Sequence, residues 1–424
     1  MTVTMTLFRN ANQADRLNGR YPDGDEPAGA GLLQLGDINY AGAFRLDGNQ
    51  HGATAFDQLS YQEKVIIAMN NTTGNLLVTG SGESNTKNFG EFEIPTLSTS
   101  TTLTDLNIGA STQDFVNVVD QLPLNTADPD DGNGITLYGM LEKGGKIIFN
   151  YARYYDTYNG GTSSETVGVV SDSTDLANST ITGAYEYDVS NRACGWMSEI
   201  PSEWQVALGG ETITGFSSGA SRGILGRLSV GPSAFVIDTD DLLAPIPANG
   251  TVVATTALMD FPYPNGMGIT NPANITAELW EAGRIWNNIS ETNYGFIVPG
   301  TSTYMCLGFD GGFTSGIGYK LHNDNYGDYD AITPTDYRNT YYLFNVNDMV
   351  RVKNGELNSY DMLPYASGTF SSPIFGEGSN DRRISGATYD AASGRLYLAV
   401  TNGDDSQGFG FFNQPLFLAY TFDV

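Results

Sequence analysis

Five short segments of the chain alternate apolar and polar residues and then end in a similar way. They are GEFEIP at 90–95, AYEYDV at 184–189, AFVIDT at 234–239, YLFNVN at 342–347 and FLAYTFDV at 417–424. A period of two residues places every second side chain on one face of a β-sheet. Because the same ending returns at long intervals, we predict one small sheet used repeatedly, which is the pattern of a β-propeller.

The chain has room for five such units of about four strands. Their other apolar runs include INYAGAFRL in the first unit, GITLYGML in the second, ACGWM and WQVALGG in the third, ELWEAGRIW and YGFIVP in the fourth, and GRLYLAV in the fifth. The last unit, 381–424, is one strand short, and we expect Tyr40–Leu46 to complete it, since this pairs both loose ends of the ring. We therefore predict an all-β, five-bladed propeller. Six blades remain an alternative, because 97–134 and 239–274 could hold further strands.

The amino-terminal region differs from the rest of the chain. Residues 1–34 have no strand pattern and contain Pro22, Pro27 and a run of Gly and Ala. We expect an extended arm over 1–34 and the propeller over 35–424. The arm is either disordered or packed on a neighbouring subunit. The start of the chain lacks a basic stretch followed by an apolar one, and no apolar run approaches about 20 residues, so neither a signal peptide nor a membrane span is predicted.

Composition narrows the possible partners. The chain has 48 acidic and 20 basic residues, for a formal charge of -28, and 51 glycines. An acidic protein repels polyanions at long range, so a nucleic-acid partner is not expected. Cys194 and Cys306 are far apart in apolar surroundings, and we expect free thiols.

Four segments in the second half carry a family resemblance. They are CGWMSEIPSEWQVALGG at 194–210, GPSAFVID at 231–238, FNVNDMVRVKNG at 344–355 and RRISGATYDAASGRLYLAV at 382–400. The chain from about 35 to its end resembles a functionally uncharacterised family of propeller-like proteins from bacterial and phage genomes. The resemblance implies a fold and supplies no catalytic residues.

Two acidic loops have the composition of a calcium site. The loop DPDDGNG supplies Asp128, Asp130, Asp131 and Asn133, and the loop HNDNYGDYD supplies Asp324, Asn325, Asp328 and Asp330. Calcium prefers several such oxygens in a flexible loop. Neither loop has a complete twelve-residue pattern, and solvated turns are the alternative, because Asp, Asn and Gly favour turns by themselves. The two histidines lack the paired spacing of a zinc site.

Aromatic residues and carboxylates occur together in two places. One cluster holds Tyr154, Tyr155 and Asp156, and the other holds Tyr326, Asp328 and Asp336. Such groups could stack on a sugar, or serve as the acid and base of a glycoside hydrolase. They could equally be ordinary strand-edge and loop residues.

The sequence names no reaction, because a propeller hosts binding, catalysis and purely structural roles. With an arm, an acidic body and no catalytic motif, we expect a non-catalytic structural or surface-binding component of an extracellular or phage virion assembly, associated with a capsid or tail. Its partners would be other assembly proteins, bound through the arm. The alternative is a secreted propeller that binds or hydrolyses glycans.

Overall fold

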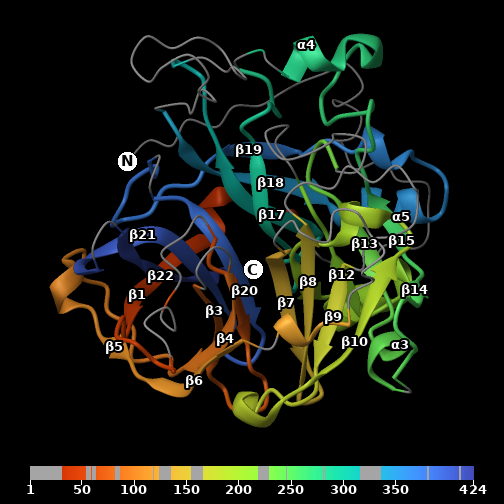
Figure 1. Cartoon of the computed structure of the whole chain (residues 1–424). Coiled ribbons are helices and arrows are strands. Elements are labelled where there is room, and N and C mark those ends of the chain that lie inside the picture. Colours follow the sequence, from red (N-terminus) through yellow and green to blue (C-terminus); the bar gives the residue numbers. More distant parts are fainter. Residues whose placement is uncertain are drawn as a thin grey trace, which may run out of the picture.

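The computed structural model describes residues 31–53, 59, 64–81, 86–117, 119–123, 135–153, 166–217, 229–244, 246–279, 281, 283–315, 336–379, 382–409 and 412–424. Five small β-sheets stand around a common centre (Figure 1). This arrangement confirms the predicted all-β, five-bladed propeller. Among the described residues, no helix is long and apolar enough to cross a membrane.

Each blade is an antiparallel sheet whose strands follow one another from the ring axis outwards. From inner to outer strand, blade 1 consists of β2 (Ile67–Met69), β3 (Leu76–Ser81), β4 (Thr86–Phe92) and β6 (Ser111–Asn117). Blade 2 consists of β7 (Ile135–Lys143), β8 (Lys146–Arg153), β9 (Val167–Val170) and β10 (Ile181–Tyr187). Blade 3 consists of β11 (Met197–Glu199), β12 (Thr212–Thr214), β13 (Ala234–Ile237) and β15 (Thr256–Met259). Blade 4 consists of β16 (Glu291–Ile297), β17 (Thr303–Asp310), β18 (Arg338–Asn345) and β19 (Ala366–Thr369).

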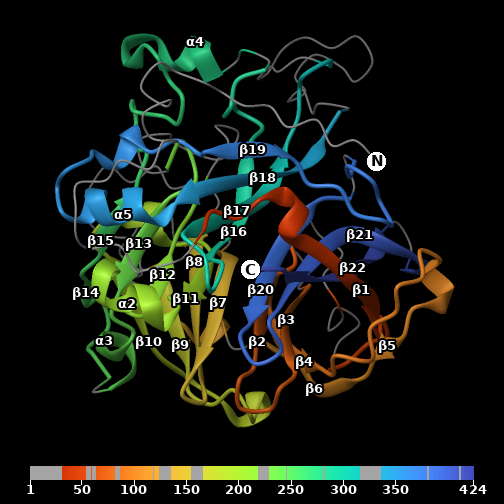
Figure 2. The same cartoon turned by 180° about the vertical axis from the view of Figure 1, so that it is seen from behind.

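Blade 5 closes the ring with strands from both ends of the chain. It consists of β20 (Ile384–Asp390), β21 (Arg395–Phe409), β22 (Phe412–Phe422) and β1 (Ile38–Leu46). Figure 1 shows β1, in red, beside β22, in dark blue, and the register places Ile38 opposite Phe422. The predicted completion of the last blade by 40–46 is therefore confirmed. The five inner strands contact one another in ring order, and four of them, β20, β2, β7 and β16, are labelled near the centre of Figure 2.

The two long segments that could have formed a sixth blade instead extend existing ones. They supply the outer strands β6 and β15, and two short strands, β5 (Ile108–Gly109) and β14 (Val252–Val253). Strand β5 pairs in parallel with β1 of blade 5, and β14 pairs in parallel with β10 of blade 2. Blades 2 and 5 therefore have five strands each.

In every blade, the segment that leads into the outer strand lies against the preceding blade of the ring. We call these five stretches the clasp segments. In blades 1 and 3 the clasp segments contain β5 and β14. In blade 2 the clasp segment contains a 3-10 turn, in which the Leu176 N–H donates to the Gln113 side chain of β6. In blade 4 it contains helix α5 (Val346–Lys353), which packs on β15.

The clasp segment of blade 5 is the end of the predicted arm. The carbonyl of Gly31 accepts from the Ser302 N–H, and the Leu33 N–H donates to Thr303 Oγ1 of blade 4. The Tyr365 hydroxyl donates to the Leu33 carbonyl. The Leu33 side chain is only 1% exposed. The last residues of the region assigned to the arm are thus part of the ring.

Two apolar runs assigned to strands do not form strands among the described residues. WQVALGG lies on α2 (Ser202–Leu208), where Trp204 and Leu208, four residues apart, are buried on one face. Gly209 ends this helix in the left-handed conformation, with φ 84°. ELWEAGRIW begins at the end of α4 (Ile275–Leu279), and its described residues after the helix, 281 and 283–286, lie in turns, bends and irregular backbone. The other helices among the described residues are α3 (Asp240–Leu243) and the 3-10 turns Leu35–Asp37, Leu103–Asp105, Val119–Gln121, Leu176–Asn178, Ser190–Ala193, Pro272–Asn274 and Ser359–Asp361.

The repeated sequence endings occupy equivalent positions in four blades. They lie on the third strands β4, β13, β18 and β22, whereas in blade 2 the ending lies on the fourth strand, β10. Their aromatic residues fill the spaces between blades: Phe92, Tyr187, Phe235 and Phe344 are fully buried, and Phe422 is partly buried. Cys194 and Cys306 are buried and form no disulfide, as expected.

The two faces of the ring differ. We call the face on which the inner strands begin the loop face, and the opposite one the turn face. Since neighbouring strands in a blade are antiparallel, second and outer strands end on the loop face. All strand ends that border undescribed internal segments of two or more residues lie on the loop face.

Candidate functional site

Most of the site residues predicted from the sequence lie outside the described residues. These are Tyr154, Tyr155, Asp156, Tyr326 and Asp328 of the aromatic clusters, and Asp128, Asp130, Asp131, Asn133, Asp324 and Asp330 of the candidate calcium loops. Their segments are bordered by strand ends on the loop face. Within the described ranges, no group of three or more His, Cys, Asp or Glu is arranged to hold a metal ion. Asp336 is the described member of the predicted set.

An ion pair occupies the axis of the ring on the loop face. Lys64, which precedes β2 of blade 1, lies 2.9 Å from the carboxylate of Glu291, which begins β16 of blade 4. The Lys64 ammonium also lies 4.4 Å from the centre of the Tyr138 ring on β7. Both charged side chains are only 8% exposed. Since blades 1 and 4 are not neighbours, these side chains fill the position where the inner strands converge.

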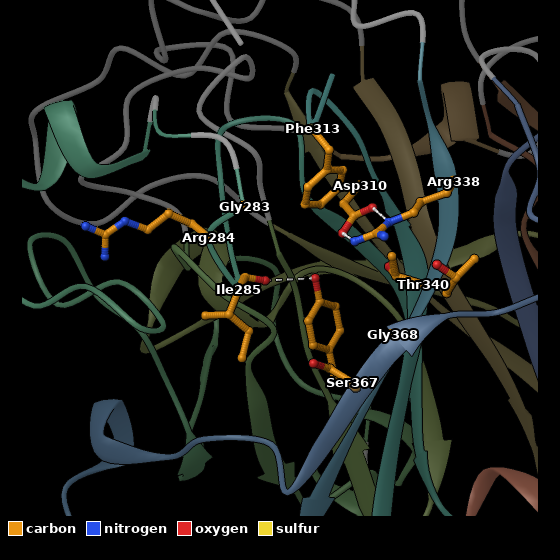
Figure 3. Close-up of a pocket in the computed structure, with 11 residues that line it drawn as sticks. Gly283, Arg284, Ile285, Asp310, Phe313, Arg338, Thr340, Ser367 and Gly368 are labelled. Carbon is orange, nitrogen blue, oxygen red and sulfur yellow. Dashed lines mark hydrogen bonds and ion pairs between the residues drawn. The ribbon is translucent and has the colours of Figure 1, made fainter. Parts of the chain in front are cut away.

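A polar cavity of about 250 Å³ lies at the loop-face end of blade 4 (Figure 3). Because side chains alternate along a strand, Arg338, Thr340 and Tyr342 of β18 share the face that lines it. Ser367 and Thr369 of β19 extend this face. The segment 283–285 covers one side, and it is held there by a 3.1 Å hydrogen bond from the Tyr342 hydroxyl to the Ile285 carbonyl.

The charged wall of the cavity is a bidentate ion pair. Arg338 Nε donates to Asp310 Oδ1 at 2.8 Å, and a terminal guanidinium nitrogen donates to Oδ2 at 3.2 Å. The guanidinium also lies 3.9 Å from the centre of the Phe313 ring. Burial raises the pKa of Asp310 to about 6, although Arg338 acts in the opposite direction. The two residues face each other where β17 ends and β18 begins.

Asp336 binds its own loop. Its carboxylate accepts hydrogen bonds from the Gly312 N–H at 2.9 Å, the Thr314 N–H at 2.7 Å, the Thr314 hydroxyl at 2.8 Å and the Ser315 hydroxyl at 2.5 Å. Burial alone would raise the pKa of Asp336, but the hydrogen bonds from Ser315, Thr314 and Gly312 outweigh it and hold the pKa well below its usual range. This carboxylate therefore fixes the chain on both sides of Phe313.

Arg284 contributes little charge to the cavity. Figure 3 shows its side chain pointing away from Asp310 and Arg338. It forms ion pairs with Glu278 at 2.7 Å and with Glu281 at 2.9 Å. The Asp310–Arg338 pair therefore dominates the charge of the lining, and its two charges balance.

The sequence patterns do not single out Asp310 and Arg338. The long connection between β17 and β18 separates Asp310 from Arg338 in the chain. The register of these two strands places the two residues opposite each other. The sequence offers one signal, a charged residue next to each apolar run. Asp310 ends the run TYMCLGFD, and Arg338 stands shortly before the run YYLFNV. Fold and cavity together define a five-bladed propeller with a polar cavity formed by the second, third and outer strands of blade 4.

Comparisons with known proteins give similarity of shape alone. No family model and no curated protein matches the chain. A luciferin-regenerating enzyme aligns at 8% identity over 91% of this chain and 94% of its own, with a TM-score of 0.32. The PQQ-bound aldose sugar dehydrogenase of Streptomyces coelicolor aligns at 10% identity over 91% and 98%, with a TM-score of 0.36. A GH43 endo-arabinanase of Bacillus licheniformis aligns at 10% identity over 84% and 91%, with a TM-score of 0.37.

Proposed function

We propose that this protein is a non-catalytic binding propeller that recognises a hydroxyl-rich ligand, a glycan, in the blade 4 cavity. The observation that carries the proposal is the bidentate Asp310–Arg338 pair in a cavity lined by the hydroxyl groups of Thr340, Ser367 and Thr369. At about 250 Å³, the cavity is smaller than the pockets of roughly 300–1,000 Å³ that hold drug-sized ligands, and its size suits about one sugar unit.

The chemistry of the lining supports a sugar. Each sugar hydroxyl both donates and accepts a hydrogen bond, so a complementary site needs donors and acceptors next to each other. Arg338 offers only donors, Asp310 in its charged form offers only acceptors, and the Ser and Thr hydroxyls offer both. The balanced charge of the pair favours a neutral sugar unit at this position.

The same geometry argues against hydrolysis at this cavity. A glycoside hydrolase needs one carboxyl group that gives a proton and a second that acts as base or nucleophile. Both oxygens of Asp310 accept from Arg338, and the carboxylate of Asp336 accepts four hydrogen bonds from its own loop. Neither carboxylate is placed to give a proton to a glycosidic oxygen or to act as base or nucleophile.

The test is a glycan-array screen followed by calorimetric titration of the best neutral ligand. We expect Arg338→Gln to weaken binding at least tenfold, because it removes the bidentate donor. Arg351→Gln is the matched control, since Arg351 also pairs with a carboxylate, Asp348 at 2.9 Å, but lies on α5. Product analysis by mass spectrometry accompanies the titration. Cleavage of the glycan by the wild type would reject the non-catalytic assignment, and absence of any glycan ligand would reject the binding role.

The attachment of residues 31–34 favours a second role, in assembly. Gly31 and Leu33 bind Ser302 and Thr303, where β17 begins on the turn face, so the loop face is left clear of this attachment. We propose that residues 1–30 connect the ring to other proteins of a virion or extracellular assembly. Quantitative mass spectrometry of purified particles, cells and medium tests this: the protein should occur at a fixed ratio to a capsid protein, and deletion of 1–30 should abolish incorporation. Free protein in the medium alone would count against it.

A further inference from the structure

We propose that Arg383 is an anion receptor on the loop face, where it takes the carboxylate or sulfate group of an acidic sugar. Arg383 directly precedes β20, the inner strand of blade 5. The inference rests on the proposed glycan-binding role for the identity of the ligand that carries the anion. The receptor itself rests on contacts that are separate from the blade 4 cavity.

The guanidinium of Arg383 lies between two aromatic rings. Its central carbon is 4.7 Å from the centre of the Phe309 ring and 4.9 Å from the centre of the Tyr337 ring. The two rings are 5.7 Å apart at an interplanar angle of 70°, so they form a notch. Aromatic faces attract a cation electrostatically, and they leave the terminal N–H groups at its edge available for an oxyanion.

Arg383 has no carboxylate partner among the residues that the structure describes. Its Nε atom is buried without a hydrogen-bond partner there. Neighbouring guanidiniums differ: Arg338 is paired with Asp310, and Arg382 lies 3.3 Å from Asp405. In a chain with a net charge of -28, an arginine held among aromatic rings without a described counter-ion is an electrostatic site for an external anion.

The backbone around Arg383 is fixed. The side chain of Asn339 accepts from the Ile384 N–H at 2.8 Å and donates to the Arg382 carbonyl at 3.4 Å. Arg383 N–H also donates to the Thr401 hydroxyl at 3.3 Å, and the Thr401 N–H donates to the Arg383 carbonyl at 3.0 Å. These bonds hold the chain on both sides of Arg383. Binding an anion would therefore cost little additional conformational entropy of the backbone.

The receptor and the cavity flank the same pair of strand ends. Phe309 is adjacent to Asp310 on β17, and Tyr337 is adjacent to Arg338, so members of each pair point to opposite sides of the sheet. Arg338 lies on the cavity side and Arg383 on the side of blade 5. A glycan with a neutral unit and an acidic unit could therefore engage both positions. The overall negative charge disfavours polyanions such as nucleic acids, which would experience long-range repulsion.

The experiment compares sodium glucuronate and inorganic sulfate with a neutral sugar, methyl glucoside. NMR of the arginine side-chain Nε–H groups in the wild type reports binding directly, and calorimetry measures affinity. We expect glucuronate and sulfate to shift the Arg383 signal, and Arg383→Gln to weaken glucuronate binding at least tenfold. Arg382→Gln is the matched control, one residue away, and should bind glucuronate like the wild type. Arg383→Lys should restore part of the affinity, because the charge remains while the fork geometry is lost.

The outcomes separate this inference from the proposed function. One outcome is glucuronate binding that depends on Arg383 together with no binding of any neutral glycan. This outcome would support the anion receptor at Arg383 and reject the blade 4 cavity as a glycan site. Neutral-glycan binding with no response of the Arg383 signal to glucuronate or sulfate would reject the receptor alone. Because the NMR shift is read on the wild type, loss of folding in Arg383→Gln would not remove the test.

Discussion

Phe44 and Phe417 stack on each other with ring centres 5.3 Å apart, and so join the first and last long strands of the chain. Both are fully buried, and Tyr397 packs edge-on against Phe44 at 6.0 Å. The ring is therefore closed by side-chain packing as well as by the hydrogen bonds between β1 and β22.

Phe44→Ala should reduce the free energy of unfolding by about 3–5 kcal/mol, the usual loss for a buried Phe. Phe422→Ala should cost less, because Phe422 is only partly buried, against Phe296 and Tyr389. Urea unfolding of both variants measures the difference. Equal stability of Phe44→Ala and the wild type would contradict the role of β1 in closure.

Lys64→Met should lower the free energy of unfolding by about 3–5 kcal/mol, because it removes a buried ammonium that lies 2.9 Å from the buried Glu291 carboxylate. The double variant Lys64→Met with Glu291→Leu should recover most of this loss, since both charges of the pair are removed together. Lys143→Met is the control: its partner Glu211 is 65% exposed, so water replaces the lost interaction. A loss in Lys64→Met no greater than in the control would reject the axial ion pair.

The pH dependence of stability should carry a contribution from Asp310 with an unusual sign. Its folded pKa of about 6 lies above the ordinary value near 3.9, so the folded state binds the proton more tightly than the unfolded state. This contribution is present at low pH and is lost, by about 2–3 kcal/mol, as the pH rises from about 4 through 6. Denaturant unfolding of wild type and Asp310→Asn across this range measures it.

Asp336→Asn provides the opposite case, because the folded pKa of Asp336 is lowered. The contribution of Asp336 to the free energy of unfolding is present above about pH 4 and is lost as the pH falls below that value.

For Asp310, the result that would contradict the prediction is a difference in unfolding free energy between wild type and Asp310→Asn that stays constant from pH 4 to 6. The structural assignment of a buried, paired Asp310 carboxyl would then be wrong.

Deletion of residues 1–34 should lower the thermal midpoint of unfolding relative to deletion of residues 1–30. The difference comes from Leu33, which is buried, and from its hydrogen bonds to Thr303 and Tyr365. Leu33→Ala in the full chain should cost about 2–5 kcal/mol. Identical midpoints for the two deletions would show that residues 31–34 add nothing to the ring.

The architecture can be predicted because each blade repeats one alternating pattern, and a shortage of one strand at the carboxyl end indicates closure by the amino end. The strands that the pattern does not reveal are short: Thr212–Thr214 has only three residues, and β5 and β14 have two each, too few for a period to show. The prediction of a strand at WQVALGG is wrong because it rests on apolar content and neglects the four-residue spacing of Trp204 and Leu208.

The candidate site is less predictable, because strand register creates it. Asp310 and Arg338 are neighbours only after β17 and β18 pair, and Arg383 reaches Phe309 only when blades 4 and 5 lie side by side. The aromatic surroundings of Asp336 draw attention to it in the sequence, and the structure gives it a local role in its loop. Local composition therefore indicates where loops occur, while tertiary packing decides which charges meet.

The clasp segments have a consequence for how the chain folds. Blades 1, 2 and 3 each receive outer support from the clasp segment of the blade that follows in the sequence, so each is incomplete until part of the next blade has been made. Blade 4 is supported by residues 31–34, which are made first. For blade 5 the order is reversed: β1 is made first, can pair with β5 early, and then waits for β22 at the end of synthesis. During that interval the β22 side of β1 is open to the β22 of another chain, so crowded expression should favour domain-swapped dimers joined through blade 5.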